Sequence, residues 1–364
     1  PERFGGAKYP QVHLVDMLGD QEESGKFGQI FSGLLQDKIE DRLQKKEQII
    51  LLQNRRGYSP VVRCGDCGDI VMCPQCKVAL TYHRKGSQLI CHCCGHFETK
   101  QREACRSCQS PNMKYSGTGT QRVESLIKET FPDARLGRLD MDTARTGSGL
   151  TKILKDFSDG KLDILLGTQM IAKGLDFPNA TLVGIINADL GLHLPDFRAG
   201  ERIFQLIYQA SGRAGRRLKP GEVVIQTYVP DNPVIKNAAK LDMMKYYNIA
   251  LSERNELKYP PFSWLAKIEI TGQNQTSANS LSERIAKALK GKYKGLDVLG
   301  PSSCYLEKLR NNYRFQIVFK SLKKVDPNGQ KLHQFITNNF RDFQKKFRPG
   351  KNRINIHFDP LSLI

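Results

Sequence analysis

Four Cys-x-x-Cys pairs lie between residues 64 and 108 and constrain the fold of this chain more than any other feature. Each pair places two sulfurs about one tetrahedral edge apart, and two pairs complete a closed four-thiolate zinc site. The start of the chain lacks the basic and then apolar pattern of a secretory signal, so metal ligation is favoured over disulfides. We therefore expect two structural zinc ions rather than redox dithiols. The eight expected ligands are Cys64, Cys67, Cys73, Cys76, Cys91, Cys94, Cys105 and Cys108.

The sequence constrains less well which two Cys-x-x-Cys turns share one zinc ion. The segment 77–90 predicts a hairpin that turns at 85–87, which would bring the flanking cysteine pairs together. We expect a nested arrangement, in which an inner site holds Cys73, Cys76, Cys91 and Cys94 and an outer site holds Cys64, Cys67, Cys105 and Cys108. Sequential pairing is the alternative. His92, Cys93 and His96 crowd the third turn and could substitute as ligands, although we interpret them as bystanders.

The net charge of +19 favours a polyanionic partner, because each neutralised phosphate releases a condensed counterion. Nucleic acid is favoured over a membrane surface, since no basic amphipathic helix with an aromatic face stands out. No run of eighteen apolar residues predicts a membrane span. The 364 residues exceed what one hydrophobic core supports, so we expect two or three domains.

Short apolar runs alternate with helical patterns on both sides of the cysteines. Ahead of them, 34–44 has helical spacing and 48–53 is typical of a buried parallel strand. After them, strands are expected over 134–139, 163–167, 181–186 and 222–228, and helices over 121–130, 150–157 and 201–210. This alternation predicts a doubly wound parallel sheet, with the zinc module inserted within one α/β domain.

Polar segments follow three elements of this α/β domain, and the carboxyl ends of parallel strands, such as 48–53, are where ligand sites of open α/β sheets lie. Arg55 and Arg56 come directly after the 48–53 strand. The loop 167–178 follows a buried strand, and 209–216 follows a helix. Two arginines separated by two small residues, as in the second of these segments, suit a fork onto phosphate oxygens.

These segments carry a family resemblance. The segment 167–178 resembles motif V of the superfamily 2 helicases, and 209–216 resembles their motif VI. The segment 52–60, followed at once by the eight cysteines, is similar to the primosomal protein N′ family of replication-restart helicases, and 196–202 strengthens the match. The resemblance covers essentially the whole chain. It implies the second RecA-like lobe of an ATP-dependent 3′→5′ DNA helicase that recognises stalled or abandoned replication forks and initiates primosome assembly.

The resemblance also implies roles in nucleotide hydrolysis. Arg216 is expected to be the arginine finger, and Arg213 is expected to contact the γ-phosphate region, where positive charge stabilises the transferring phosphoryl group. Gln209 would position the water or the phosphate. Gly174 and Asp176 would line the nucleotide cleft. ATP and Mg²⁺ are the expected cofactors of the complete protein, in addition to zinc.

Thr168, Arg55 and Arg56 are the expected DNA contacts. The family resemblance further implies forked and single-stranded DNA, single-stranded DNA-binding protein and other primosome proteins as partners, in a bacterial cytoplasm and associated with the nucleoid. No membrane partner is expected.

The phosphate loop Gly-x4-Gly-Lys-Ser/Thr and any Asp-Glu dipeptide are missing from this sequence. Mg-ATP binding needs such a loop and an acidic metal-holding motif, so we expect this chain alone to hydrolyse no ATP. The chain starts at Pro1 without an initiator Met, and we expect an N-terminal lobe to be missing; a processed N-terminus is the alternative. A zinc-containing DNA-binding or scaffold protein that acts without nucleotide is the competing function, and an RNA-binding zinc ribbon is a third.

The order of elements near the C-terminus indicates a small separate domain. Strands are expected over 263–271, 295–299, 313–320 and 352–358, with helices over 276–289 and 329–347. This βαββαβ order is that of a ferredoxin-like fold. The expected division is 1–63 for the start of the lobe, 64–110 for the zinc module, 111–230 for the rest of the lobe, 231–262 for a linking helix and 263–364 for the C-terminal domain.

Overall fold

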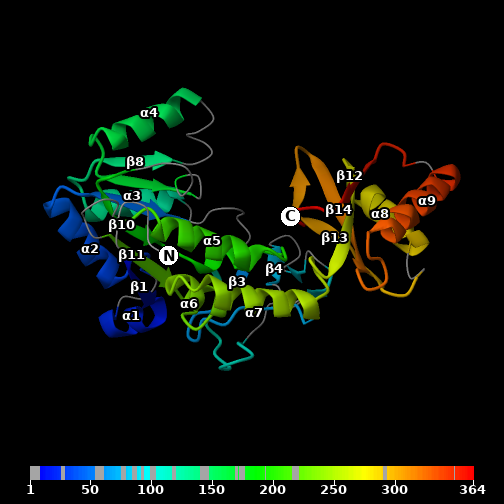
Figure 1. Cartoon of the computed structure of the whole chain (residues 1–364), viewed down its shortest axis with the longest axis horizontal. Helices are drawn as coiled ribbons and strands as arrows, with labels where there is room; N and C mark the ends of the chain where they lie inside the picture. The colour runs from blue at the N-terminus through cyan, green and yellow to red at the C-terminus, as the bar shows by residue number, and fades with distance from the viewer. Residues whose placement is uncertain are drawn as a thin grey trace.

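The structure is a computed structural model. It describes residues 9–25, 29–53, 61–74, 79–83, 88–91, 94–98, 104–116, 120–139, 147–168, 171, 177–192, 194–214, 221–289, 293–347 and 349–364. Within these ranges the strands form three sheets, which belong to an α/β lobe, a cysteine-rich module and a C-terminal domain (Figure 1). No helix in the described ranges combines the length and the apolar character that crossing a membrane requires.

The lobe is built on a six-stranded parallel sheet. Its strands, in spatial order, are β1 (Gln11–Asp16), β11 (Glu222–Thr227), β10 (Ala180–Ile185), β2 (Gln48–Leu52), β9 (Ile164–Gly167) and β8 (Leu136–Leu139). Every residue of β2, β9 and β10 is buried, as the apolar runs predicted for strands covered on both faces. The predicted doubly wound sheet is confirmed.

Helices cover both faces of this sheet. One face packs against α2 (Gly33–Gln44) and α3 (Thr120–Thr130), which contribute Leu35 and Ile127 to its core. The other face packs against α4 (Gly147–Ser158), α5 (Ala199–Ser211) and α6 (Pro233–Ala239). Side chains alternate between the two cores along each strand, because successive residues of a strand point to opposite faces. A short helix, α1 (Met17–Ser24), follows β1.

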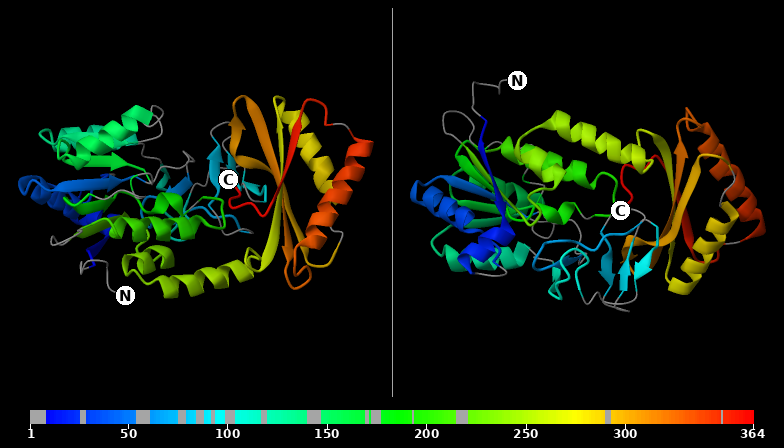
Figure 2. Two further views of the ribbon diagram at one scale, coloured as in Figure 1. Left: turned by 45° about the horizontal axis from the view of Figure 1, so that its top comes forward. Right: turned by 90° about the horizontal axis from the view of Figure 1, so that it is seen from below.

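The cysteine-rich module is an antiparallel sheet inserted between β2 and α3 of the lobe. Its strands, in spatial order, are β6 (Phe97–Glu98), β5 (Gln88–Ile90), β4 (Thr81–His83), β3 (Val61–Cys64) and β7 (Met113–Ser116). The predicted hairpin is present as the β4–β5 pair, although its turn lies outside the described residues. The first and last strands pair with each other, Val61 opposite Ser116, so the sheet reaches beyond the range 64–110 on both sides. The module lies between the lobe and the C-terminal domain (Figure 2).

The predicted single linking helix is wrong, because two helices occupy that region. They are α6 and α7 (Met243–Glu256). Between them, Leu241 has a φ of 55°, which no helix accommodates, and the Asp242 side chain accepts the amide of Lys245 to begin a new helix.

The C-terminal domain has the predicted ferredoxin-like order. Its elements are β12 (Ser263–Gly272), α8 (Gln275–Leu289), β13 (Leu296–Leu309), β14 (Asn312–Leu322), α9 (Gln330–Lys346) and β15 (Arg353–Phe358). The sheet order is β13-β14-β12-β15, with antiparallel neighbours. Both helices pack on one face through an apolar core that includes Ile285 and Ile336. The strand β13 extends ten residues past its expected end. Its pairing with β14 shifts register between Leu299 and Ser302 and again between Ser303 and Lys308, but it continues as far as Leu309.

Candidate functional site

Four cysteine sulfurs converge at the outer site. The Sγ atoms of Cys64, Cys67, Cys105 and Cys108 all lie within 4.8 Å of one another. The Cys64–Cys108 distance is 3.5 Å and the Cys67–Cys105 distance is 3.6 Å, so sulfurs of the first turn face sulfurs of the last. A tetrahedral zinc ion with Zn–S bonds of about 2.3 Å needs sulfurs about 3.8 Å apart. The geometry therefore fits a closed four-thiolate zinc site.

Backbone amides and polar side chains brace this outer cluster. The amide of Asp66 donates to Cys64 Sγ and the amide of Ser107 donates to Cys105 Sγ, both at 3.4 Å. Donors of this kind favour the thiolate form that a metal requires. The carboxylate of Asp69 accepts the Ser107 hydroxyl at 2.7 Å, which ties the two turns together across the site.

Three sulfurs converge at the inner site. The Sγ atoms of Cys73, Cys91 and Cys94 also lie within 4.8 Å of one another, with 3.7 Å between Cys73 and Cys94. The expected fourth ligand, Cys76, lies outside the described residues, as do His92 and Cys93. Cys73 of the second Cys-x-x-Cys turn thus lies with Cys91 and Cys94 of the third, as the nested arrangement requires.

The two clusters contact different parts of the molecule. A Cβ at Gly68, beside the outer cluster, would lie 2.8 Å from the carbonyl oxygen of Tyr228 in the lobe. The guanidinium of Arg63 lies 3.3 Å from the centroid of the same tyrosine ring. A Cβ at Gly95, beside the inner cluster, would lie 2.9 Å from the carbonyl oxygen of Pro301 in the C-terminal domain. The module therefore contacts a different domain at each end.

The described nucleotide and DNA candidates lie at the ends of lobe elements. Thr168 follows β9 at the carboxyl edge of the sheet, where the amide of Gln53 donates to the carbonyl of Gly167 at 2.9 Å. Arg213 lies two residues beyond α5, and Gln209 lies on the exposed face of that helix. The remaining candidates, Arg55, Arg56, Gly174, Asp176 and Arg216, lie outside the described residues.

Gln209 lines a cavity that sequence reasoning did not anticipate. The cavity has a volume of about 650 Å³ and lies between α5, α7 and the C-terminal domain. Arg198, Arg254 and Lys323 contribute cationic groups to its wall, and Trp264 contributes an aromatic ring. The face of α5 that carries Gln209 therefore points toward the C-terminal domain.

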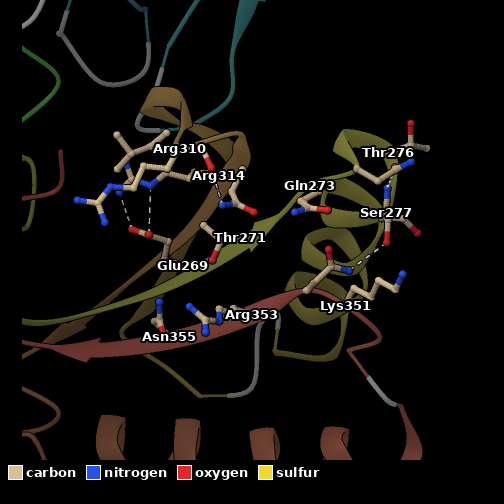
Figure 3. A pocket seen from close by; sticks show the side chains of 15 residues that line it. Glu269, Thr271, Gln273, Thr276, Ser277, Arg310, Arg314, Lys351, Arg353 and Asn355 are labelled. Carbon is tan, nitrogen blue, oxygen red and sulfur yellow. Dashed lines mark hydrogen bonds and ion pairs between the residues drawn. The ribbon is translucent and has the colours of Figure 1, made fainter.

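A larger, polar groove of about 1130 Å³ lies on the C-terminal domain (Figure 3). Its cations are Arg310, Arg314, Lys351 and Arg353, and Glu269 is the acidic residue among its lining side chains. The Glu269 carboxylate accepts Nε and Nη2 of Arg314 at 3.2 and 2.9 Å. Burial raises the pKa of Glu269, but Arg314 and Lys267 outweigh burial and hold that pKa below its usual value. The groove therefore keeps an excess of positive charge, as a phosphate-binding surface requires.

Three family models match parts of the chain. Residues 73–98 match the "PriA DNA helicase Cys-rich region (CRR) domain", residues 115–217 match the "Helicase conserved C-terminal domain", and residues 255–361 match the "Primosomal protein N C-terminal domain". The first match covers the inner part of the cysteine-rich module, the second covers much of the lobe after that module, and the third covers the C-terminal domain.

Curated relatives are similar over most or all of the chain. The replication restart protein PriA of Bacillus subtilis is 44 % identical over 85 % of this chain and 38 % of its own length. That of Treponema pallidum is 38 % identical over 100 % of this chain and 53 % of its own length. That of Synechocystis is 36 % identical over 100 % of this chain and 43 % of its own length. The chain thus spans about half the length of these relatives or less.

Proposed function

Because this chain belongs to the PriA family of replication restart proteins, we propose that it forms the second lobe, zinc module and C-terminal domain of an ATP-dependent 3′→5′ DNA helicase. The complete protein would recognise stalled or abandoned replication forks and initiate primosome assembly. One observation carries the proposal: the zinc module follows β2 of a parallel sheet, and the neighbouring strand β9 is followed at once by Thr168.

The proposed nucleotide site uses residues from the last turn of α5, from the segment after that helix and from the segment after β9. Arg216 is the proposed arginine finger, Arg213 contacts the γ-phosphate region, and Gln209 positions the water or phosphate. Gly174 and Asp176 line the cleft. The fixed cations act by stabilising charge on the transferring phosphoryl group, while ATP and Mg²⁺ are held mainly by the N-terminal lobe of the complete protein.

The proposed DNA contacts are Thr168, Arg55 and Arg56, together with the polar groove of the C-terminal domain. The excess of cations in that groove supports phosphate binding. We further propose single-stranded DNA-binding protein and other primosome proteins as partners, and a cytoplasmic location at the bacterial nucleoid.

The cysteine-rich module binds zinc, and we propose two ions in the nested arrangement. Cys64, Cys67, Cys105 and Cys108 would hold one ion, and Cys73, Cys76, Cys91 and Cys94 would hold the other. A closed four-thiolate site supplies folding energy and leaves no position open for a catalytic water. The ions therefore stabilise the module, and its surface meets DNA or a primosome protein.

Arg216→Ala in the complete protein tests the proposal. Loss of an arginine finger lowers turnover by about a thousandfold or more, so DNA-stimulated ATP hydrolysis should fall by that factor. Arg217→Ala, one residue along the chain, is the matched control and should retain turnover. Unchanged hydrolysis in the Arg216 variant would instead favour the nucleotide-independent zinc scaffold. The present chain by itself should hydrolyse no ATP.

A further inference from the structure

A buried carboxylate joins the lobe to the C-terminal segment of the chain. Asp196 is 3 % exposed and lies just before α5. Its Oδ2 atom accepts the hydroxyl of Ser362 at 2.5 Å and the amide of Leu363 at 3.3 Å. These two residues follow β15 by only a few positions, so the Asp196 side chain connects the lobe to a residue 166 positions further along the chain.

The same carboxylate is bonded to the start of α5. Its Oδ1 atom accepts the amide of Arg198 at 2.9 Å, and its Oδ2 atom lies 3.1 Å from the guanidinium of Arg202. A buried charge is costly unless it is paired and hydrogen-bonded, and the four partners named here belong either to the start of α5 or to the C-terminal segment. The position of the segment and the position of the helix are therefore set by one group.

A second contact reaches the same turn of α5. Arg254 of α7, the helix that leads into the C-terminal domain, donates to Glu201 at 2.5 Å. Around both contacts lies a small apolar cluster that draws on the lobe, the linker and the C-terminal domain. Its members are Phe197, Leu257, Tyr259, Leu265, Leu299, Val318 and Leu363. The rings of Phe197 and Tyr259 stack at 5.1 Å. The N-terminal turn of α5 is thus held from two sides by the C-terminal domain and its linker.

The other end of α5 leads to the proposed nucleotide site. The helix ends at Ser211, two residues before Arg213, and thirteen residues at about 1.5 Å each give a rod about 20 Å long. A packed helix moves as a unit, so a shift at its first turn is carried to its last.

We propose that Asp196 is a positioning residue that couples the C-terminal domain to ATP hydrolysis. By binding the backbone and hydroxyl of 362–363, it makes the orientation of α5, and hence of Arg213, depend on where the C-terminal domain lies. DNA held by that domain then sets the rate of hydrolysis. This inference rests on the proposed helicase function.

Two variants of the complete protein test the coupling. Ser362→Ala removes the hydroxyl that Asp196 accepts, and Asp196→Asn removes the charge while leaving an oxygen for the Arg198 amide. Both should lower the DNA-stimulated kcat by about tenfold, a typical coupling between two sites. Hydrolysis without DNA, KM for ATP and Kd for forked DNA should each stay within about twofold. Ser362→Thr, which keeps the hydroxyl, should restore the rate.

Asp231→Asn is the matched control, because it breaks an exposed ion pair with Lys236 in the same lobe and should change none of these quantities. An unchanged DNA-stimulated kcat in both test variants would overturn the proposal. An equal loss with and without DNA would also overturn it, since that result describes a damaged site rather than lost coupling.

Hydrogen exchange of the present chain separates this inference from the proposed function. Forked DNA should slow amide exchange in the first turn of α5 by about tenfold in the unaltered chain and have no effect on that turn in Ser362→Ala. If the complete protein hydrolyses no ATP, the helicase proposal fails, and this readout still decides whether DNA on the C-terminal domain acts on α5 through Ser362. Identical protection by DNA in both chains would refute it.

Discussion

The two cysteine clusters have the same ligand chemistry but contact different parts of the molecule. The outer cluster, formed by Cys64, Cys67, Cys105 and Cys108, is braced by hydrogen bonds across the site and packs on the lobe near Tyr228. The inner cluster, which includes Cys73, Cys91 and Cys94, packs on the C-terminal domain near Pro301. Two sites with the same kind of ligand can therefore stabilise different contacts in this protein.

The neighbours of each cluster define its effect. The outer cluster includes Cys64, the last residue of β3, so we expect its integrity to maintain the packing of the module on the lobe. The inner cluster joins residues that flank the β4–β5 hairpin, and we expect it to hold the surface that faces the C-terminal domain. Variants that remove one cluster at a time should therefore have unequal consequences.

The largest effect is expected from Cys105→Ser combined with Cys108→Ser. Structural zinc supplies on the order of 10 kcal/mol of binding free energy to a small module, so loss of the outer ion should unfold the module near the lobe. Metal analysis should show one zinc ion fewer per chain, and β3 and β7 should lose hydrogen-exchange protection. Cys304→Ser, at an isolated buried thiol, is the control and should retain all zinc. Retained protection of β3 and β7 would contradict the assignment.

A smaller effect is expected from Cys73→Ser combined with Cys94→Ser. One zinc ion should again be lost, but β3 and β7 should stay protected because the outer cluster holds them. Duplex unwinding by the complete protein should fall, since the face toward the C-terminal domain is lost. Unwinding at the unaltered rate would show that the inner cluster has no role in unwinding. The assignment of two zinc ions would still stand.

The glycines beside the clusters allow a finer comparison. Gly68 and Gly95 have φ values of 76° and 82°, where a side chain costs about 1–2 kcal/mol, and each lies against a carbonyl of its neighbouring domain. Gly68→Ala should destabilise the lobe–module contact, and Gly95→Ala the contact with the C-terminal domain. Gly160→Ala, at a φ of 74° with open space around it, measures the backbone strain alone. Equal losses of unfolding free energy in all three variants would show that the contacts add nothing.

The smallest effect is expected at the ring beneath Arg63. Tyr228→Leu removes the aromatic face from the guanidinium and should cost about 0.5–1 kcal/mol of unfolding free energy. Tyr228→Phe keeps the ring and should cost little. A double-mutant cycle with Arg63→Gln isolates the pair, and a coupling energy of zero would exclude a stabilising contact between Arg63 and the Tyr228 ring.

Local patterns predicted local structure well. The cysteine spacing indicated the clusters, and apolar runs such as 48–53 indicated buried strands, because turns and burial leave short-range signals in the sequence. The edge strand β1 gave no such signal. It exists because Gln11 and the residues after it pair with β11, more than 200 residues away. The contact between Asp196 and Ser362 escaped prediction for the same reason, since neither residue carries information about its distant partner.

The pairing of Val61 with Ser116 has a consequence for how such a protein can change over evolutionary time. The first and last strands of the module pair with each other there, so its two ends lie about 5 Å apart. The lobe therefore folds around a short, closed junction whatever the length of the segment beyond it, because loop closure costs little extra as a loop grows. Gene segments encoding larger, smaller or differently liganded modules can be exchanged at this junction, and a reporter domain with adjacent termini can be grafted there.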